Sequence, residues 1–292
     1  MVVENLIRQL LSGVSLGMVI FIIAVGLSLI FGTLKFLNMA HGSIYMLGAF
    51  LCYWLTSTFS QVTGIFWWSL ILAPIGAALF GGLMEVVLIR RIYGLHMMYH
   101  WILTFGLILF ISDMCKLLWG VEYYMVSPPW PLNGPVSIFG VYFPAYNVFI
   151  MILGPIIFVG LWALLHYTRL GRIIRAATFN PEMVNALGVN VPLVYTGVFM
   201  LGCWLAGLGG TLIAPMTAVS LGMDAAVIVD CFIIVVIGGL GSTLGAFIGA
   251  IIFGLSYAFG VLAFPKLAIG IGFIIMAIIL IVRPWGLMGK PE

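Results

Sequence analysis

The sequence predicts an all-α membrane protein, a polytopic bundle of about eight or nine transmembrane segments that includes Gly-broken half-helices. Of its 292 residues, 64% are hydrophobic and only 7% are charged, whereas soluble domains carry roughly 25% charged residues. The apolar runs extend over about 18 to 26 residues, a length that suits helices and exceeds that of barrel strands. We therefore expect one transmembrane domain over residues 1–292, without a separate soluble domain.

Basic residues are few, and most of them lie near the ends of the apolar runs. The eleven Lys and Arg residues outnumber the eight Asp and Glu residues, which gives a net charge of +3. This pattern orients helices in an inner membrane, because loops rich in Lys and Arg stay in the cytoplasm. It is not the dense basic patch typical of nucleic-acid binding. We expect a multi-pass inner-membrane protein that contacts lipid and no nucleic acid.

Five apolar runs make up the first part of the chain, at about 6–31, 44–59, 65–89, 101–118 and 148–167. The first run is too long for a signal-peptide core and lacks a convincing cleavage site, so we expect it to remain as a span. Arg90 and Arg91 follow the third run and indicate the cytoplasmic side. Residues 120–146 are rich in Pro and aromatic residues, carry Glu122 and contain no basic residue, which predicts the outer face.

The longest polar run, residues 169–190, follows the fifth apolar run. It contains three arginines, Arg169, Arg172 and Arg175. Further along, Asn180 can accept a backbone N–H bond, Pro181 suits the first helical position, and Glu182 favours the positive end of a helix. Gly188 suits the residue just past the end of that helix.

We therefore expect a short surface helix at about 181–187 within a basic loop. One interpretation is a handle that a soluble partner grips. The alternative is a cytoplasmic loop whose charges only set the orientation of the chain.

Four further apolar segments follow, at about 193–215, 226–237, 244–262 and 267–282. The glycine-rich stretch Gly238-Gly239-Leu240-Gly241-Ser242 separates the middle two, of which the first is a candidate half-helix. Asp224 precedes them in a short outer loop. All segments together number nine, which places the amino terminus opposite the Arg-rich loops. If the break is re-entrant, or if the Lys35 region lies inside the bilayer, the number is eight and the side of the amino terminus stays open.

The sequence lacks the motifs of an enzyme or a metal site. It contains no GxxxxGK[ST] motif, so we do not expect the chain to hydrolyse ATP itself. His96 and His100 are spaced i and i+4 but have no acidic partner, which favours a structural role. A nucleophile elbow and paired carboxylates near a base are also missing. Four cysteines without CxxC spacing are interpreted as free core thiols: Cys52, Cys115, Cys203 and Cys231.

Two polar breaks inside apolar regions are candidates for a solute path. The first is Asn38-Met39-Ala40-His41-Gly42-Ser43, and the second is Asp230 with the glycine-rich stretch that follows it. Buried polar groups are costly unless they face a cavity or a partner, and Gly-interrupted segments in both halves of a transporter often mark the solute path. The alternatives are a short inner connector and an interfacial Asp230. We interpret Glu85, near Arg90, as paired or exposed at the inner surface.

A set of short motifs runs along nearly the whole chain. They are AVGLSLIFG at 24–32, LNMAHG at 37–42, YMLGA at 45–49, GRIIRA at 171–176, NPE at 180–182, LGVN at 187–190, LAGLGG at 205–210, VIGGLGS at 236–242 and RPWGL at 283–287. Each is weak alone, but in combination they resemble LivH-type permeases. These are inner-membrane subunits of bacterial branched-chain amino acid ABC importers.

The resemblance implies a channel-forming subunit of a bacterial inner membrane with several partners. These are a second homologous permease, two cytoplasmic ATPase subunits and a periplasmic solute-binding protein. The ATPases would hydrolyse ATP, and this chain would bind no cofactor. Residues 169–190 would contain a coupling helix that docks on an ATPase, with these residues matching the motif: Gly171, Arg172, Arg175, Asn180, Pro181, Glu182 and Gly188.

Two departures from the family pattern leave the solute open. Family members usually carry an aromatic residue where Met39 stands and an acid where Ser43 stands, and relatives also import urea, amides and other carboxylates. The main alternative function is a secondary transporter or channel without an ATPase, in which Asp230 would relay ions. Dependence of uptake on ATP or on an ion gradient separates the two functions.

Overall fold

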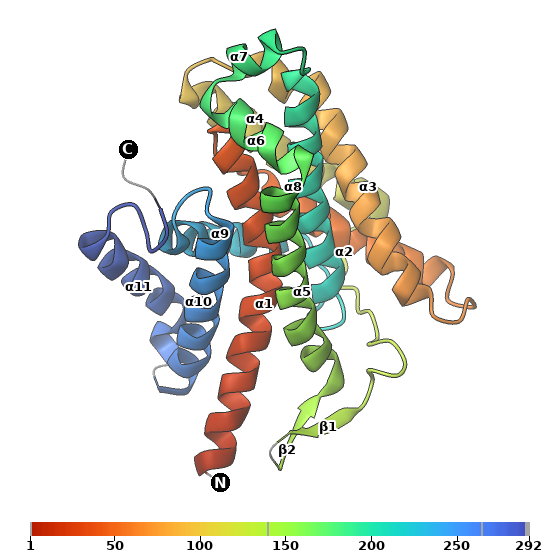
Figure 1. Cartoon of the computed structure of the whole chain (residues 1–292). Coiled ribbons are helices and arrows are strands. Elements are labelled where there is room, and N and C mark those ends of the chain that lie inside the picture. Colours follow the sequence, from red (N-terminus) through yellow and green to blue (C-terminus); the bar gives the residue numbers. More distant parts are fainter. Residues whose placement is uncertain (1, 139, 264, 290–292) are drawn as a thin grey trace.

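The computed structural model describes residues 2–138, 140–263 and 265–289, which form a helical bundle (Figure 1). The α-helices are α1 (Val2–Leu34), α2 (His41–Thr58), α3 (Ile65–Val87), α4 (Met97–Trp119), α5 (Ala145–Tyr167), α6 (Arg169–Phe179), α7 (Pro181–Ala186), α8 (Val191–Ile213), α9 (Met223–Gly238), α10 (Thr243–Ala263) and α11 (Ala268–Val282). Two short 3-10 helices, η1 (Ile89–Ile92) and η2 (Pro265–Leu267), complete the helical elements. The all-α prediction is confirmed.

Each of the nine predicted apolar segments forms a helix. Within the described ranges, six helices are long and apolar enough to cross a membrane: α1, α3 with η1, α4, α5, α8 and α10. The other three are α2, α9 and α11, with 18, 16 and 15 residues. All nine predicted segments are helical, but only six are long enough to cross a membrane by themselves, so the predicted number of eight or nine transmembrane segments is approximate.

Of the six long helices, α1 is the most buried, with 83% of its most apolar stretch inside the molecule. It passes through the middle of the bundle between α10 and α5 (Figure 1). Small residues allow this close approach, because a Cβ atom on Gly17 would lie 2.6 Å from the carbonyl oxygen of Ala250. On another side, a Cβ atom on Gly26 would lie 2.7 Å from the carbonyl oxygen of Gly202. Glycine thus sets the helix spacing where lipid provides no hydrophobic driving force.

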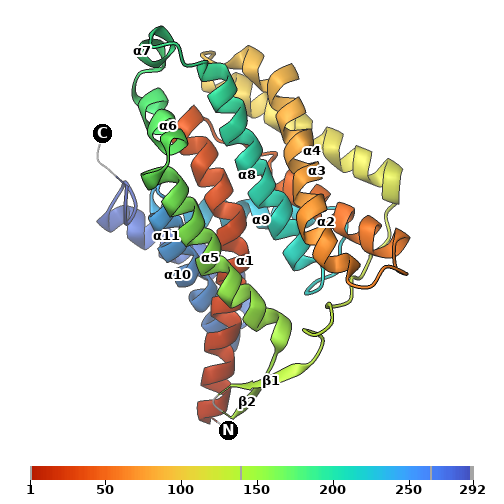
Figure 2. The same ribbon diagram turned by 45° about the vertical axis from the view of Figure 1, so that its right-hand side comes forward.

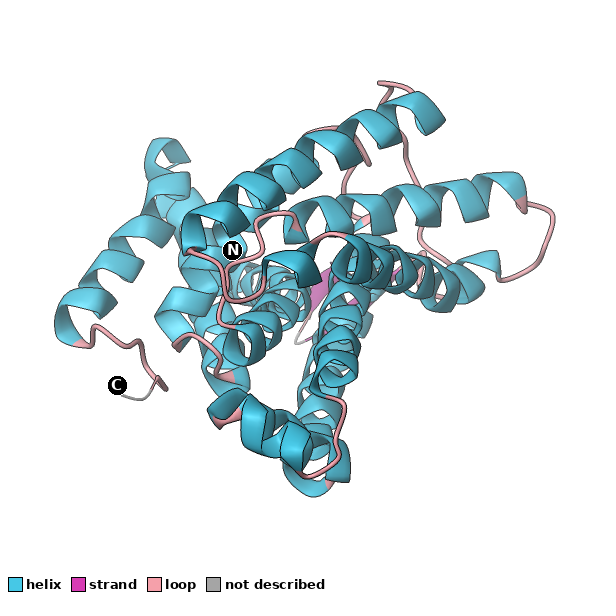
Figure 3. Cartoon of the chain, turned by 90° about the horizontal axis from the view of Figure 1, so that it is seen from above, coloured by secondary structure: helices cyan, strands magenta, loops and turns pink. Residues whose placement is uncertain are grey.

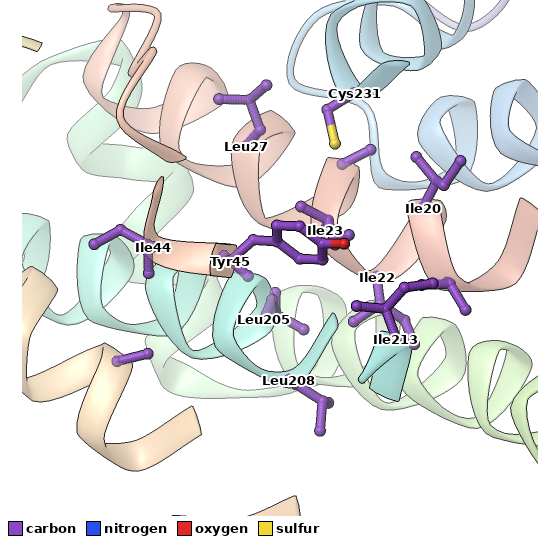
Figure 4. Packing of buried hydrophobic residues seen from close by; sticks show 14 of the residues in the cluster. Ile20, Ile22, Ile23, Leu27, Ile44, Tyr45, Leu205, Leu208, Ile213 and Cys231 are labelled. Carbon is purple, nitrogen blue, oxygen red and sulfur yellow. The ribbon is translucent and has the colours of Figure 1, made fainter. Parts of the chain in front are cut away.

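The core joins four helices around the middle of α1. Tyr45 of α2, Ile23 of α1, Leu205 of α8 and Cys231 of α9 belong to one buried cluster (Figure 4). All four cysteines are buried and free, as predicted. Seen from above, the described residues are almost all helical, and the strands lie beneath the helices (Figure 3).

A β-hairpin in the predicted outer loop was not expected. Strands β1 (Pro135–Ile138) and β2 (Val141–Pro144) pair antiparallel, with Val136 opposite Phe143. Val141 and Phe143 are buried, whereas the residues between and after them are exposed. Strands of four residues among prolines leave too little alternation to be predicted from sequence.

The hairpin and the basic loop lie at opposite ends of the bundle (Figures 1 and 2). Helix α1 begins at the hairpin end and finishes at the end that carries α6 and α7. Since Arg-rich loops face the cytoplasm, α6 and α7 mark the inner end. The beginning of α1 then lies at the outer end, opposite the Arg-rich loops.

Candidate functional site

The first polar break returns into the bundle after α1 has ended. His41, the first residue of α2, donates a hydrogen bond from Nε2 to the carbonyl oxygen of Ile23, over 2.9 Å. Ile23 lies eleven residues before the end of α1, which corresponds to roughly 16 Å along a helix. Helix α2 therefore starts deep inside the molecule, and residues 35–40 form a re-entrant loop.

A second helix also starts inside the molecule, and it meets the first. Asp224, in the first turn of α9, is only 6% exposed. The Ser43 hydroxyl donates a 2.7 Å hydrogen bond to its Oδ2 atom. A Cβ atom on Gly42 would lie 2.6 Å from the carbonyl oxygen of Asp224, so only glycine permits this approach. The amino-terminal ends of α2 and α9 thus form a junction, where both carry partial positive charge.

The sequence-based hypothesis placed residues 38–43 against the glycine-rich stretch after Asp230, and the structure differs from it. The glycine-rich stretch packs elsewhere: Gly241 lies against Gly32 at the end of α1, and Gly239 lies against Gly289. Ser242 caps the following helix by accepting from the N–H of Gly245. Asp230 itself is half-buried on α9. The acid that meets residues 38–43 is Asp224, which the sequence had placed in an outer loop.

Two polar atoms beside the junction have no hydrogen-bond partner within the described part of the chain. They are Asn38 Nδ2 and His41 Nδ1, and both residues are fully buried. Because Nε2 of His41 donates to a carbonyl, its Nδ1 is left as an acceptor. Asn38 Oδ1 already accepts from the N–H of Ala40, so Nδ2 is a free donor. Buried atoms of this kind are rare in folded proteins, and here they could bind a small polar molecule.

Two cavities open at the hairpin end of the molecule rather than at this junction. One, of about 700 Å³, is lined by Trp67 and Trp130 among others. The second, of about 590 Å³, is lined by Tyr142 and Tyr146 among others. Neither is lined by residues 38–43. Asn38, His41 and Ser43 are buried in this structure.

At the inner end, the predicted short helix is present as α7. Asn180 Oδ1 accepts from the N–H of Met183 over 3.0 Å, and Pro181 is the first helical residue. Gly188 follows the helix with a φ of 85°, the left-handed conformation that glycine favours. Glu182 is exposed and carries its charge at the helix start.

Helix α6, which precedes α7, was predicted only as a basic loop. Its buried residues, Gly171, Ile174 and Ala177, recur every three residues. Arg172 is exposed, while Arg175 donates to the carbonyl oxygen of Leu165 at the end of α5. This spacing of small and apolar residues between the arginines is the signal that could have revealed the helix.

His96 and His100 have structural roles, as predicted from the sequence. Within residues 2–138, 140–263 and 265–289, no group of three or more His, Cys, Asp or Glu side chains could hold a metal ion. His96 caps α4 by accepting from the N–H of Met98. His100 is buried and stacks against Phe36, with 5.0 Å between ring centroids.

Known proteins match the chain along nearly its whole length. The family model described as "branched-chain amino acid transport system / permease component" matches residues 9–282. The high-affinity branched-chain amino acid transport system permease protein BraD of Pseudomonas aeruginosa is 27% identical, over 99% of this chain and 98% of that protein. LivH of Escherichia coli K12, with the same description, is 26% identical over 98% of this chain and 96% of that protein.

An archaeal relative matches over a shorter region. The probable branched-chain amino acid transport permease protein LivH of Methanocaldococcus jannaschii is 29% identical, over 49% of this chain and 47% of that protein. The family model covers all the helices that could cross a membrane, apart from the first residues of α1. The chain therefore belongs to the family of permease components of branched-chain amino acid transport systems, as a multi-pass inner-membrane subunit of an ABC importer.

Proposed function

We propose that this chain forms the translocation path for branched-chain amino acids, or for a related small amide or carboxylate, with the junction of α2 and α9 as its gate. The single observation that carries the path is the Ser43–Asp224 hydrogen bond between two helices that both begin inside the molecule. The solute class follows from the names of the relatives. Transporters of several folds bind solutes at such helix starts, because backbone N–H groups there lack intrahelical partners.

The chemistry of the junction suits a zwitterion. The free donor on Asn38 and the helix starts favour a carboxylate, whereas Asp224 and the half-buried Asp230 favour an ammonium group. Ile228 lies beside Gly42 and offers apolar contact for a hydrocarbon side chain. When α2 and α9 separate, these groups would face a common space.

The energy for transport would come from partners. The assembly would contain a second homologous permease, two cytoplasmic ATPase subunits and a periplasmic solute-binding protein. The ATPases would bind and hydrolyse ATP, while this chain would hold no cofactor and catalyse no reaction. Support comes from α7, a capped helix that projects at the inner end beyond α6 (Figure 1). Such a helix can transmit a rigid-body movement to α8, which follows it directly.

The importer reconstituted in proteoliposomes with its partners tests the path and its energy source. Uptake of radiolabelled L-leucine should require ATP and should persist when ionophores collapse ion gradients. The variant Asp224→Leu should abolish uptake, whereas Asp113→Leu, at an exposed acid of α4, should leave it within about twofold. Accumulation of leucine by the purified subunit alone, driven by an ion gradient, would refute the proposal and favour a secondary transporter.

The coupling role of α7 has a separate test. The variants Arg175→Glu and Glu182→Arg should abolish leucine uptake while the permease still inserts into the membrane in normal amounts. Arg175 serves in part to hold the end of α5, so Glu182→Arg, at an exposed position, is the cleaner variant. Normal docking of the ATPases and normal transport in both variants would exclude this role for the loop.

A further inference from the structure

A buried carboxylate near the inner end joins α3 to α8. Glu85 is 0% exposed, and three side chains donate to it. Arg90 donates over 3.3 and 3.1 Å, Tyr93 over 2.9 Å and Thr196 over 2.7 Å. Glu85 was expected to be paired or exposed at the inner surface; it is paired with Arg90 but lies inside the protein. Its burial is supported by hydrogen bonds to both of its oxygens.

Tyr93 belongs to this cluster and also contacts two other elements. Its ring lies 6.0 Å from that of Tyr195 in α8, edge to face at 86°. On another side its ring lies 6.4 Å from that of Phe36 in the re-entrant loop. One side chain therefore touches the inner part of α8 and the loop that leads to the junction.

On the α8 side, Tyr195 connects Tyr93 to α6 and α7. The Tyr195 hydroxyl donates to the carbonyl oxygen of Ala177 in α6, over 3.2 Å. Val184, the buried residue of α7, shares a small apolar cluster with Ala177 and Val191, against which Tyr195 packs. A displacement of α7 must therefore move Tyr195 or break these contacts.

The loop side leads to the junction of α2 and α9. Phe36 is 2% exposed and lies two residues before Asn38, whose side-chain Nδ2 atom has no hydrogen-bond partner within the described residues. Lys35, just before Phe36, has a φ of 58°. Residues other than glycine seldom adopt this left-handed conformation. Phe36 lies between the rings of Tyr93 and His100, and a loop that is strained at its start can be shifted by a small movement of the Tyr93 ring.

We infer that Tyr93 is a positioning residue that transmits movement of α7 through Tyr195 to Phe36, and so opens the junction at Asn38. The inference rests on the proposed function. The Glu85 cluster holds the Tyr93 hydroxyl in place, so that α3 and the start of α8 move as one unit while the ring acts on the loop. Contiguous packing of this kind is the physical route by which two distant sites are coupled.

The test uses the complete importer in proteoliposomes, with L-leucine as the probe. The measured quantity is the ratio of leucine molecules moved to ATP molecules hydrolysed. Tyr93→Leu should assemble, should keep basal ATP hydrolysis within about twofold, and should lower this ratio at least tenfold. Phe36→Leu should lower the ratio to a similar extent. The double variant should be no worse than either single one, because residues on one route are not additive. Tyr93→Phe keeps both ring contacts and should lower the ratio only about threefold.

Tyr146→Leu is the matched control. Tyr146 is 2% exposed and donates to the carbonyl oxygen of Leu212, but it lies at the start of α5, at the outer end. Its variant should reduce the amount of assembled complex without changing leucine moved per ATP. An unchanged ratio in Tyr93→Leu, an equal loss in Tyr146→Leu, or multiplied losses in the double variant would each overturn the inference. If Tyr93→Leu does not assemble, Phe36→Leu and Tyr93→Phe decide, and unchanged ratios in both overturn it.

A second readout needs no solute. The thiol of an Asn38→Cys variant of the assembled complex should react with a water-soluble reagent faster in one nucleotide state than in another. Adding Tyr93→Leu should abolish this difference, and adding Tyr146→Leu should not. If the wild-type complex transports no leucine, but the Asn38→Cys complex shows the difference and Tyr93→Leu abolishes it, the proposed solute fails while the role of Tyr93 stands. If the difference survives Tyr93→Leu, the inference falls.

Discussion

Two buried polar regions of this protein differ in how completely their hydrogen bonds are made. Around Glu85, both carboxylate oxygens accept hydrogen bonds from neighbouring side chains. Around the α2–α9 junction, Ser43 and Asp224 are bonded, but Asn38 and His41 each leave one buried atom without a partner.

The difference indicates a division of roles. A fully bonded buried cluster stabilises one arrangement of its helices, since opening it exposes several unpaired groups at once. A partly bonded cluster gains when a ligand supplies the missing partners. This difference supports the proposed function, in which the Glu85 cluster is a rigid joint and the junction is the gate for the solute.

The largest loss of stability should follow removal of the Glu85 carboxylate. Glu85→Ala leaves the donors of Arg90 and Tyr93 without this acceptor, although Thr196 can still donate to the carbonyl oxygen of Pro192. It should destabilise the complex by about 3 kcal/mol. The loss stays at the lower end of the range for buried ion pairs, because the Arg90 side chain is 35% exposed and can regain water. The shift in the thermal unfolding midpoint of the purified complex measures it. Glu122→Ala, at an exposed acid of the outer loop, serves as control, and an equal shift there would contradict the comparison.

A smaller loss of stability, with a larger loss of transport, should follow a change at the junction. Asp224→Asn keeps the shape of the side chain but weakens the hydrogen bond from Ser43. The unfolding free energy of the complex should fall by about 1 kcal/mol. Leucine uptake should nevertheless fall at least tenfold, because the carboxylate is the proposed partner of the solute ammonium group. Initial uptake rates at saturating binding protein measure this effect. Asp113→Asn is the control, and normal uptake in Asp224→Asn would remove the gate assignment.

The smallest effect on transport should come from Asn38, whose Nδ2 atom has no hydrogen-bond partner within the described residues. Asn38→Leu removes the free donor together with one hydrogen bond to the N–H of Ala40. Because the buried N–H of Ala40 then loses its acceptor, we expect the unfolding free energy to fall by about 1 kcal/mol, as for Asp224→Asn, while leucine uptake falls at least threefold. Asn133→Leu, at an exposed site in the outer loop, should alter neither property. A strongly destabilised Asn38→Leu would indicate a structural role like that of Glu85.

Features that depend on neighbouring residues were predictable. The start of α7 follows from Asn180 and Pro181, whose cap and fixed φ act within one turn. Its end follows from Gly188. By contrast, α6 was missed because its arginines obscured the spacing of its three small or apolar buried residues, and β1 and β2 because short strands carry little periodicity.

The candidate site was only partly predictable. The polar break at residues 38–43 was found because polar groups stand out in an apolar sequence. Its partner was misplaced, since Asp224 lies beside a loop in sequence and gives no sign of burial. The re-entrant course of residues 35–40 brings Gly42 and Ser43 against it inside the molecule.

The sequence by itself determined the membrane environment, the helical segments, the orientation signals and the family, because each depends on local composition or on short motifs. Only the tertiary structure decided which helix ends meet. The hydrogen bond from Ser43 to Asp224 joins residues 181 positions apart, and that from Thr196 to Glu85 joins residues 111 positions apart. Such pairs arise from the close packing of whole helices at glycines such as Gly42, where a single added carbon atom would separate the chains.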